Sequence, residues 1–306
     1  MESLSRGWNF LREAWQMAFK DNDLIKPSIF AMIAGFFVTI VGLVPLIGAA
    51  LLFGDSGLIG RALMVVVGAV LVFAHYVVTY IFSGMTVYLI YGYLAEGDGR
   101  MDKAWAKVGR EFWSIISLAG ASTLVSVVTS QMRRSSSRGR AATSFLGGAL
   151  AGLIDTVWTE ASYLILPAMM IEDANLPTGI KRATQIAKGN LLLIGVSTVG
   201  VRWVTGAIGF VLGLLGLLIG LGIGSLIIAI LGTGTLGLVL GIGLGALLFF
   251  GFVMVASVIS SYTMTAYNTC LFLWARDVEK ARAQQGTTGA IPVQIPAPAP
   301  LAAVFK

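Results

Sequence analysis

The 306-residue chain is 57% hydrophobic and only 12% charged, with a mean hydropathy of +0.86. Soluble domains carry about 25% charged and about 45–50% apolar residues, so this composition excludes an ordinary soluble protein. A helix needs about 20 predominantly apolar residues to cross the hydrocarbon core of a bilayer. Several such runs are present, and they predict an all-α polytopic transmembrane helical bundle.

The first 26 residues are expected to form an N-terminal amphipathic helix. Apolar residues recur at helical spacing between residues 3 and 20, and polar residues take the opposite side. Two tryptophans on the apolar face are typical of a helix lying in the headgroup plane. The alternative is a helix packed on the protein's own cytoplasmic surface, and both interpretations stay open. The apolar face comprises Leu4, Trp8, Leu11, Trp15 and Ala18.

We expect about six spans, arranged as three hairpins that are each preceded by an amphipathic surface helix. The second surface helix contains Met101 and Trp105, and the third begins near Pro177. Together the spans make a membrane domain of residues 27–276, and the Pro/Ala-rich tail, 277–306, is expected to be disordered. The predicted spans are 28–53, 62–94, 112–131, 145–171, 191–231 and 235–275.

The last two predicted spans are rich in regularly spaced glycine. Small residues at four-residue spacing let helix backbones approach closely in lipid, which predicts that these spans form the tightest hairpin of the fold. Homodimerisation through the same ridge is the alternative. The glycines are Gly209, Gly213, Gly216, Gly220 and Gly224 in the fifth span, and Gly237, Gly241 and Gly245 in the sixth.

The distribution of Lys and Arg predicts a multi-pass protein of the cell membrane with both termini in the cytoplasm. In the six-span model, 15 basic residues lie on the side of the termini and 5 on the other, as the positive-inside rule requires. The Arg-rich loop, 132–143, departs from that rule: either it is translocated, or the third and fourth segments do not both cross. The net charge of +6 predicts contact with anionic lipids rather than nucleic acid.

Four ionisable residues fall within apolar runs: His75, Asp155, Glu160 and Arg202. Charges inside hydrocarbon are costly and usually mark function or pairing. We predict an intramembrane polar cluster, with a Glu160–Arg202 ion pair as its natural centre. If the fifth span begins at Trp203 instead, Arg202 is an interfacial anchor.

No enzyme signature survives inspection, so we expect no catalytic activity and no cofactor. One histidine and one cysteine, Cys270, in different runs make no credible metal site. The string GTGTLG at 232–237 matches a dinucleotide-binding pattern, but no soluble βαβ unit surrounds it.

Short motifs along residues 3–275 resemble a prokaryotic family of six-helix integral membrane proteins of unknown function. The layout is more distantly similar to the membrane domain that accompanies glycerophosphodiester phosphodiesterases, whose catalytic part is absent here. Asp155 and Glu160 are not part of the family pattern. The resemblance implies the six-helix fold and no particular activity. It rests on Ser5-Arg6-Gly7-Trp8, Trp15, Asp23-Leu24 and Pro27, and later on Trp158, Pro167, Glu172 and Ile180-Lys181-Arg182-Ala183.

These features favour a membrane scaffold, assembly or membrane-organising protein that contacts the lipid bilayer and either a second copy of itself or another membrane protein. A small transporter or channel that uses the polar cluster is the alternative. A lipid-handling protein is the third possibility.

Overall fold

The computed structural model describes residues 2–53, 57–136, 141–189, 191–285, 297–298 and 300–302. These residues form helices, and no strand occurs among them. Six candidate spans show that the chain is a multi-pass membrane protein with an all-α, six-span fold, which confirms the expected fold class. Their bounds are Asn22–Leu52, Ala62–Glu96, Phe112–Arg134, Gly147–Glu172, Gly200–Leu231 and Thr235–Ala281.

The chain divides into two compact units. The first comprises Met1–Lys20, Leu191–Tyr267 and Pro296–Lys306, and the second comprises Asp21–Asn190 and Asn268–Ile295. The long helix α9, Thr235–Gln285, contributes its first part to one unit and its last part to the other.

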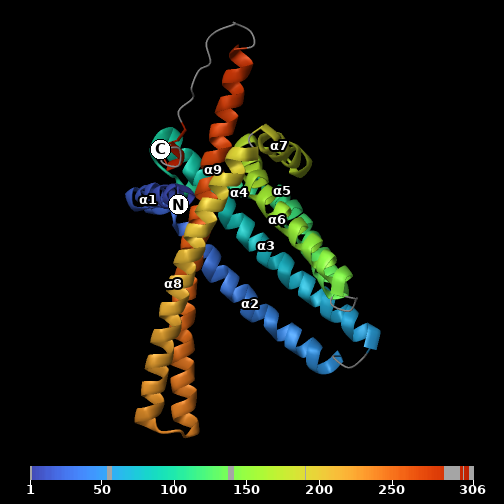
Figure 1. Cartoon of the computed structure of the whole chain (residues 1–306), viewed down its shortest axis with the longest axis vertical. Coiled ribbons are helices and arrows are strands. Elements are labelled where there is room, and N and C mark those ends of the chain that lie inside the picture. Colours follow the sequence, from blue (N-terminus) through green and yellow to red (C-terminus); the bar gives the residue numbers. More distant parts are fainter. Residues whose placement is uncertain are drawn as a thin grey trace. The chain divides into compact units, whose positions relative to one another are not determined.

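In the first unit, α1 (Glu2–Lys20) packs against α8 (Leu191–Leu231) and the first part of α9 (Figure 1). The indole Nε1 of Trp15 donates a hydrogen bond to Thr263 Oγ1 at 3.2 Å, and the Tyr262 hydroxyl donates one to the Ala14 carbonyl at 2.9 Å. The α1 helix therefore packs on the protein's own helices, which is the second of the two interpretations of its amphipathic pattern.

Other side chains of α1 point away from that contact. Trp8 and Phe19 are exposed, although Phe10 and Ala14 are fully buried. A role for this exposed face in the headgroup plane remains a prediction.

Glycines bring the backbones of α8 and α9 into close contact. A Cβ added at Gly220 would lie 2.5 Å from the Gly245 carbonyl oxygen, and one at Gly224 would lie 2.7 Å from that of Gly241. The helices are joined by a turn in which Gly232 has φ +81°, a conformation that suits glycine (Figure 1). Part of the predicted glycine ridge is therefore used within this hairpin.

The position of α1 limits how much of the α8–α9 hairpin crosses hydrocarbon. A Cβ at Gly7 would lie 2.5 Å from the Gly200 carbonyl oxygen, so α1 crosses α8 at that residue. The charged residues Arg6, Arg12, Glu13 and Lys20 keep α1 out of the hydrocarbon. From this level to the turn, α8 covers residues 200–231 and α9 covers residues 235–262, each at least about 40 Å long at 1.5 Å per residue, which suffices for a span.

This level has two consequences for the predicted boundaries. Arg202 lies beside Gly200 and exposed Trp203, which favours its interpretation as an interfacial anchor. The predicted sixth span, 235–275, is longer than needed, because Tyr262 and Thr263 already lie at the level of α1.

The second unit is built from two hairpins and two short connecting helices. The hairpins are α2–α3 and α5–α6, and α3 also contacts α5 and α6. The short helices α4 and α7 follow α3 and α6, at the ends remote from the hairpin turns. Helix bounds are η1 Asn22–Leu24, α2 Lys26–Phe53, α3 Gly57–Glu96, α4 Met101–Arg110, α5 Phe112–Ser136, α6 Ala141–Glu172 and α7 Leu176–Gly189.

The packed core of the second unit lies toward the end that carries α4 and α7. Its largest buried side chains come from the last part of α3, the first part of α5, the last part of α6 and the end of α9. The opposite part of the α2–α3 hairpin exposes apolar side chains such as Phe37, Val41 and Val70, as a lipid-facing surface does. Fully buried core residues include Met85, Leu89, Ile90, Ile115, Leu118, Ile165, Met169 and Phe272.

Two predicted boundaries differ from the helices observed. The α5 helix runs to Ser136, so Arg133 and Arg134 are helical rather than part of a loop, and residues 137–140 lie outside the described residues. The α9 helix continues to Gln285, so the first nine residues of the predicted tail, 277–285, are helical. An ion pair between Glu279 and Arg182 of α7, at 2.5 Å, holds this extension. Residues 286–296 of the tail also lie outside the described residues.

We predict that Gly220→Ala destabilises the protein by roughly 1–3 kcal/mol, because the new methyl group would meet the Gly245 carbonyl. Gly222→Ala is the matched control, since nothing lies within 4 Å of a Cβ there. Alanine is the better helix former by about 1 kcal/mol, so the control should be neutral or slightly stabilising. Thermal unfolding in detergent measures both. Equal melting temperatures for the two variants would contradict the described packing.

Candidate functional site

A polar seam connects α3, α5 and α6 inside the second unit. The Tyr80 hydroxyl and Ser122 Oγ share a hydrogen bond of 2.7 Å, and the Trp158 indole Nε1 donates to the same Ser122 oxygen at 2.9 Å. Tyr80 and Ser122 are buried. One serine on α5 therefore binds a side chain from each of the two neighbouring spans.

The seam continues toward the α5–α6 turn. The Tyr76 ring stacks on Tyr80, with centroids 5.8 Å apart and planes 13° apart. The Arg133 guanidinium pairs with the Asp155 carboxylate at 3.1 Å, which joins α5 to α6. Asp155 also lies close enough to interact electrostatically with Tyr76. We use the name polar seam for Tyr76, Tyr80, Ser122, Arg133, Asp155 and Trp158.

The spacing of these residues explains why they meet. Tyr76 and Tyr80 on α3 are four residues apart, so they share one helix face. Ser122 lies on the buried side of α5, and Trp158 is nearly one turn after Asp155 on α6. Because hydrogen bonds between side chains of different helices stabilise association in lipid, the seam fastens three spans together.

The structure places two of the four predicted cluster residues, His75 and Asp155, in different surroundings. Asp155 is in the seam, and its ion-pair partner is Arg133, which the sequence analysis placed in a loop. His75 is exposed on α3 and faces α2, where a Cβ at Gly35 would lie 3.3 Å from its Cε1 atom. His75 and Asp155 therefore belong to different helix contacts.

The two residues of the predicted Glu160–Arg202 pair belong to different units. Glu160 is half-buried on α6 in the second unit, and Arg202 is half-buried on α8 in the first. The pair stays a prediction.

A second group of polar residues lies where α4 meets the turn between α6 and α7. Lys107 of α4 is only 3% exposed. Its ammonium group pairs with Asp173, in that turn, and with Glu111 at 3.5 Å. Burial lowers the pKa of Lys107, and the carboxylate of Glu111 opposes that shift. Asp173 has φ +53°, which is rare for a residue other than glycine.

Arg182 of α7 ties the same region to α9. Its guanidinium contacts Glu172 at 3.0 Å and Glu279 at 2.5 Å. Burial by itself would lower the pKa of Arg182, but the hydrogen bonds to the two carboxylates raise it above its ordinary value. The guanidinium therefore lies between two carboxylates, which keep the arginine charged and hold α7 against the end of α9.

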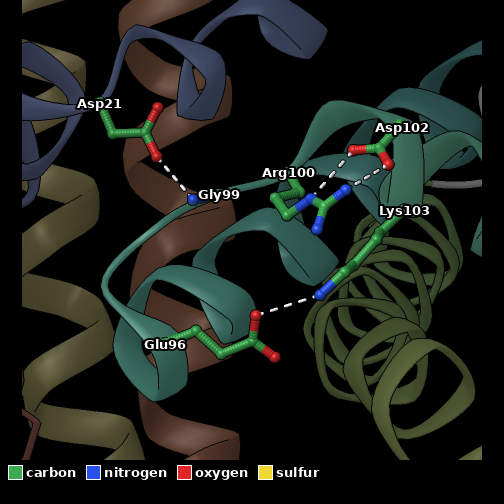
Figure 2. Close-up of polar contacts among 6 residues, drawn as sticks. All are labelled: Asp21, Glu96, Gly99, Arg100, Asp102 and Lys103. Carbon is green, nitrogen blue, oxygen red and sulfur yellow. Dashed lines mark hydrogen bonds and ion pairs between the residues drawn. The ribbon is translucent and has the colours of Figure 1, made fainter.

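Polar contacts also order the connection between α3 and α4 (Figure 2). The Gly99 amide donates a hydrogen bond to Asp21 Oδ2 at 2.7 Å, and Lys103 pairs with Glu96 at 3.1 Å. Arg100 pairs with Asp102 at 2.9 Å, and its hydrogen bond lowers the pKa of that carboxyl group. These contacts fix the start of α4.

Two grooves along the spans are apolar. One of about 500 Å³ lies between α2 and α3, lined by residues such as Phe37, Pro45 and Leu71. Another of about 360 Å³ follows the α8–α9 hairpin, where Ser225 is the one lining residue with a polar side chain. Neither offers charged groups to a polar solute.

No group of three His, Cys, Asp or Glu side chains that could hold a metal ion occurs within the described part of the chain. Cys270 is fully buried. No protein-family model matches the chain, and no curated protein is significantly similar to it in sequence. The resemblance to six-helix membrane proteins therefore stays a prediction.

We predict that Ser122→Ala destabilises the protein by about 1–2 kcal/mol, since interhelical hydrogen bonds in membrane proteins average about 0.6 kcal/mol and this serine makes two. Ser117→Ala is the matched control, because Ser117 is on the same helix and bonds only to its own helix, at the Trp113 carbonyl. Thermal unfolding in lipid nanodiscs compares them. Equal losses of thermal stability in Ser117→Ala and Ser122→Ala would show that the interhelical hydrogen bonds of Ser122 do not stabilise the fold.

Proposed function

We propose that this multi-pass protein resides in the cell membrane and acts as a non-enzymatic scaffold or assembly partner. The carrying observation is the polar seam: its described hydrogen bonds and ion pair join the protein's own side chains, and the nearby grooves are apolar. Such an arrangement supports helix packing rather than a path for ions.

The distribution of exposed surface also supports a scaffold. The α2–α3 hairpin and the α8–α9 hairpin expose many large apolar side chains along their lengths, including Leu51, Phe210 and Leu247. Surfaces of this kind meet lipid or the helices of another membrane protein. The short helices α4 and α7 form a polar end of the second unit, where ion pairs of Lys107 and Arg182 hold them to neighbouring segments. Bilayer lipids, anionic lipids, a second copy and another membrane protein are the proposed partners.

The first test is native mass spectrometry of the protein extracted together with its surrounding lipid. A defined oligomer, or a second protein in fixed stoichiometry, is the result expected for a scaffold. A lone monomer that carries ions or small polar molecules would contradict it and favour the transporter alternative.

A flux assay in reconstituted vesicles examines the transporter alternative directly. We expect no ion flux above that of empty vesicles, and no change with Asp155→Asn or Glu160→Gln, because the described partners of Asp155 are protein groups. Flux that is present in the wild type and lost in either variant would replace the scaffold by a small transporter.

The proposed topology places both termini in the cytoplasm. We predict that Asp98→Cys, in the α3–α4 connection, reacts with a membrane-impermeant maleimide only from the cytoplasmic side. Thr233→Cys, in the α8–α9 turn, should react only from the opposite side. Both are made in a Cys270→Ser background, although buried Cys270 should itself react slowly. Labelling of both positions from one side would contradict six spans in this orientation.

A further inference from the structure

The α4 helix and the first turn of α5 expose an unusual set of side chains, which we call the α4 shelf: Trp105, Arg110, Phe112 and Trp113. Trp105 is 50% exposed and Trp113 is 76% exposed. Glu111 separates the two helices, with φ −90° and ψ 11°. Its amide donates a hydrogen bond to the Lys107 carbonyl, and its own carbonyl accepts one from the Ile115 amide. Three exposed aromatic side chains, Trp105, Phe112 and Trp113, therefore lie close together in the sequence around one helix junction.

The opposite side of α4 is fixed to the protein. Ala104, Lys107 and Val108 are buried there, and Lys107 pairs with Asp173 and Glu111. The orientation of α4 is therefore fixed, and its exposed shelf residues stay on the surface. Val108 is buried against the protein, whereas Trp105 is half-exposed.

The charges around the shelf leave one cation without a partner. Asp102 pairs with Arg100, and Glu96 pairs with Lys103 (Figure 2). Glu111 pairs with Lys107. Arg110 is exposed and has no ion-pair partner in the part of the chain that the structure describes. Asp102, Glu96 and Glu111 are thus paired with other cations, and the exposed Arg110 guanidinium belongs to the same junction as the exposed aromatic side chains.

The shelf is continuous with the surface of the membrane spans. The ring centroids of Trp105 and Phe82 of α3 are 6.3 Å apart, and those of Phe82 and Phe30 of α2 are 6.2 Å apart. Phe30 is exposed in the first turns of its span, and the α5 span begins at Phe112. Aromatic rings at this level of a membrane protein mark the boundary between hydrocarbon and headgroups.

We propose that the α4 shelf binds an anionic phospholipid, with Trp105, Phe112 and Trp113 in the interfacial layer and the Arg110 guanidinium on the lipid phosphate. Arginine presents several donors that match phosphate oxygens. The inference rests on the proposed placement in the cell membrane and gives its lipid partner a site. The site lies on the side that carries the basic excess.

The test is native mass spectrometry of the intact protein in a neutral detergent, titrated with phosphatidylglycerol or with phosphatidylcholine. The wild type should bind at least one phosphatidylglycerol more tightly than phosphatidylcholine. Arg110→Gln should weaken phosphatidylglycerol binding about fivefold, as expected for one basic residue at an anionic surface, and should leave phosphatidylcholine binding unchanged. Trp113→Ala should weaken binding of both lipids.

The matched control is Lys280→Gln, which removes an equally exposed cation from α9, outside the shelf. Wild-type binding by this control, with loss in Arg110→Gln, supports the assignment. Equal phosphatidylglycerol binding by Arg110→Gln and the wild type, or equal loss in Lys280→Gln, overturns it. The titration is read on each oligomeric species separately, so a failed scaffold proposal, seen as a lone monomer, is distinguishable from a failed lipid site.

Discussion

The constraint on which this structure depends is that a polar side chain inside hydrocarbon has no water to bind, so its partner must come from the protein. Ser122 satisfies it by bonding to Tyr80 and Trp158, which stand on two other spans. The Arg133–Asp155 ion pair joins two half-exposed charges of α5 and α6 near the end of α5. Because these groups engage one another, the outer surfaces of the same helices are left to meet lipid or other helices.

Close backbone contact performs the corresponding role in the first unit, where few polar side chains are available. Gly220 and Gly245 let α8 and α9 approach until a methyl group would no longer fit. Gly7 allows the same approach of α1 to Gly200. Because the charged residues of α1 are costly in hydrocarbon, the α1 contact sets the level at which we expect the hairpin to leave it.

Composition and apolar runs predicted the all-α, six-span fold, because the thickness of hydrocarbon sets the length of a span. The sequence pattern did not reveal the polar seam, for physical reasons. The sequence analysis selected His75 on α3 because it is ionisable, whereas the neighbouring Tyr76 and Tyr80 take part in the seam. Tyrosine counts as an apolar residue in a hydropathy pattern, so their hydroxyl groups gave no signal. Arg133 was assigned to a loop because four arginines cluster there, and its pairing with Asp155 depends on where α5 ends. Contacts between distant segments, such as Arg182 with Glu279, leave no local pattern to detect.

The central claim is that the buried polar groups of the spans, such as Tyr80 and Ser122, form a packed contact between helices and not a water-filled path. Substituted-cysteine accessibility tests it most directly: Ser122→Cys and Ser162→Cys, both at buried positions, are made in a Cys270→Ser background and exposed to a small, charged thiosulfonate reagent from each side of the membrane. The account predicts no reaction at either position, while a cysteine at Asp98 reacts rapidly. Rapid modification of either cysteine, at position 122 or 162, from the aqueous phase would contradict it and show a pathway through the protein.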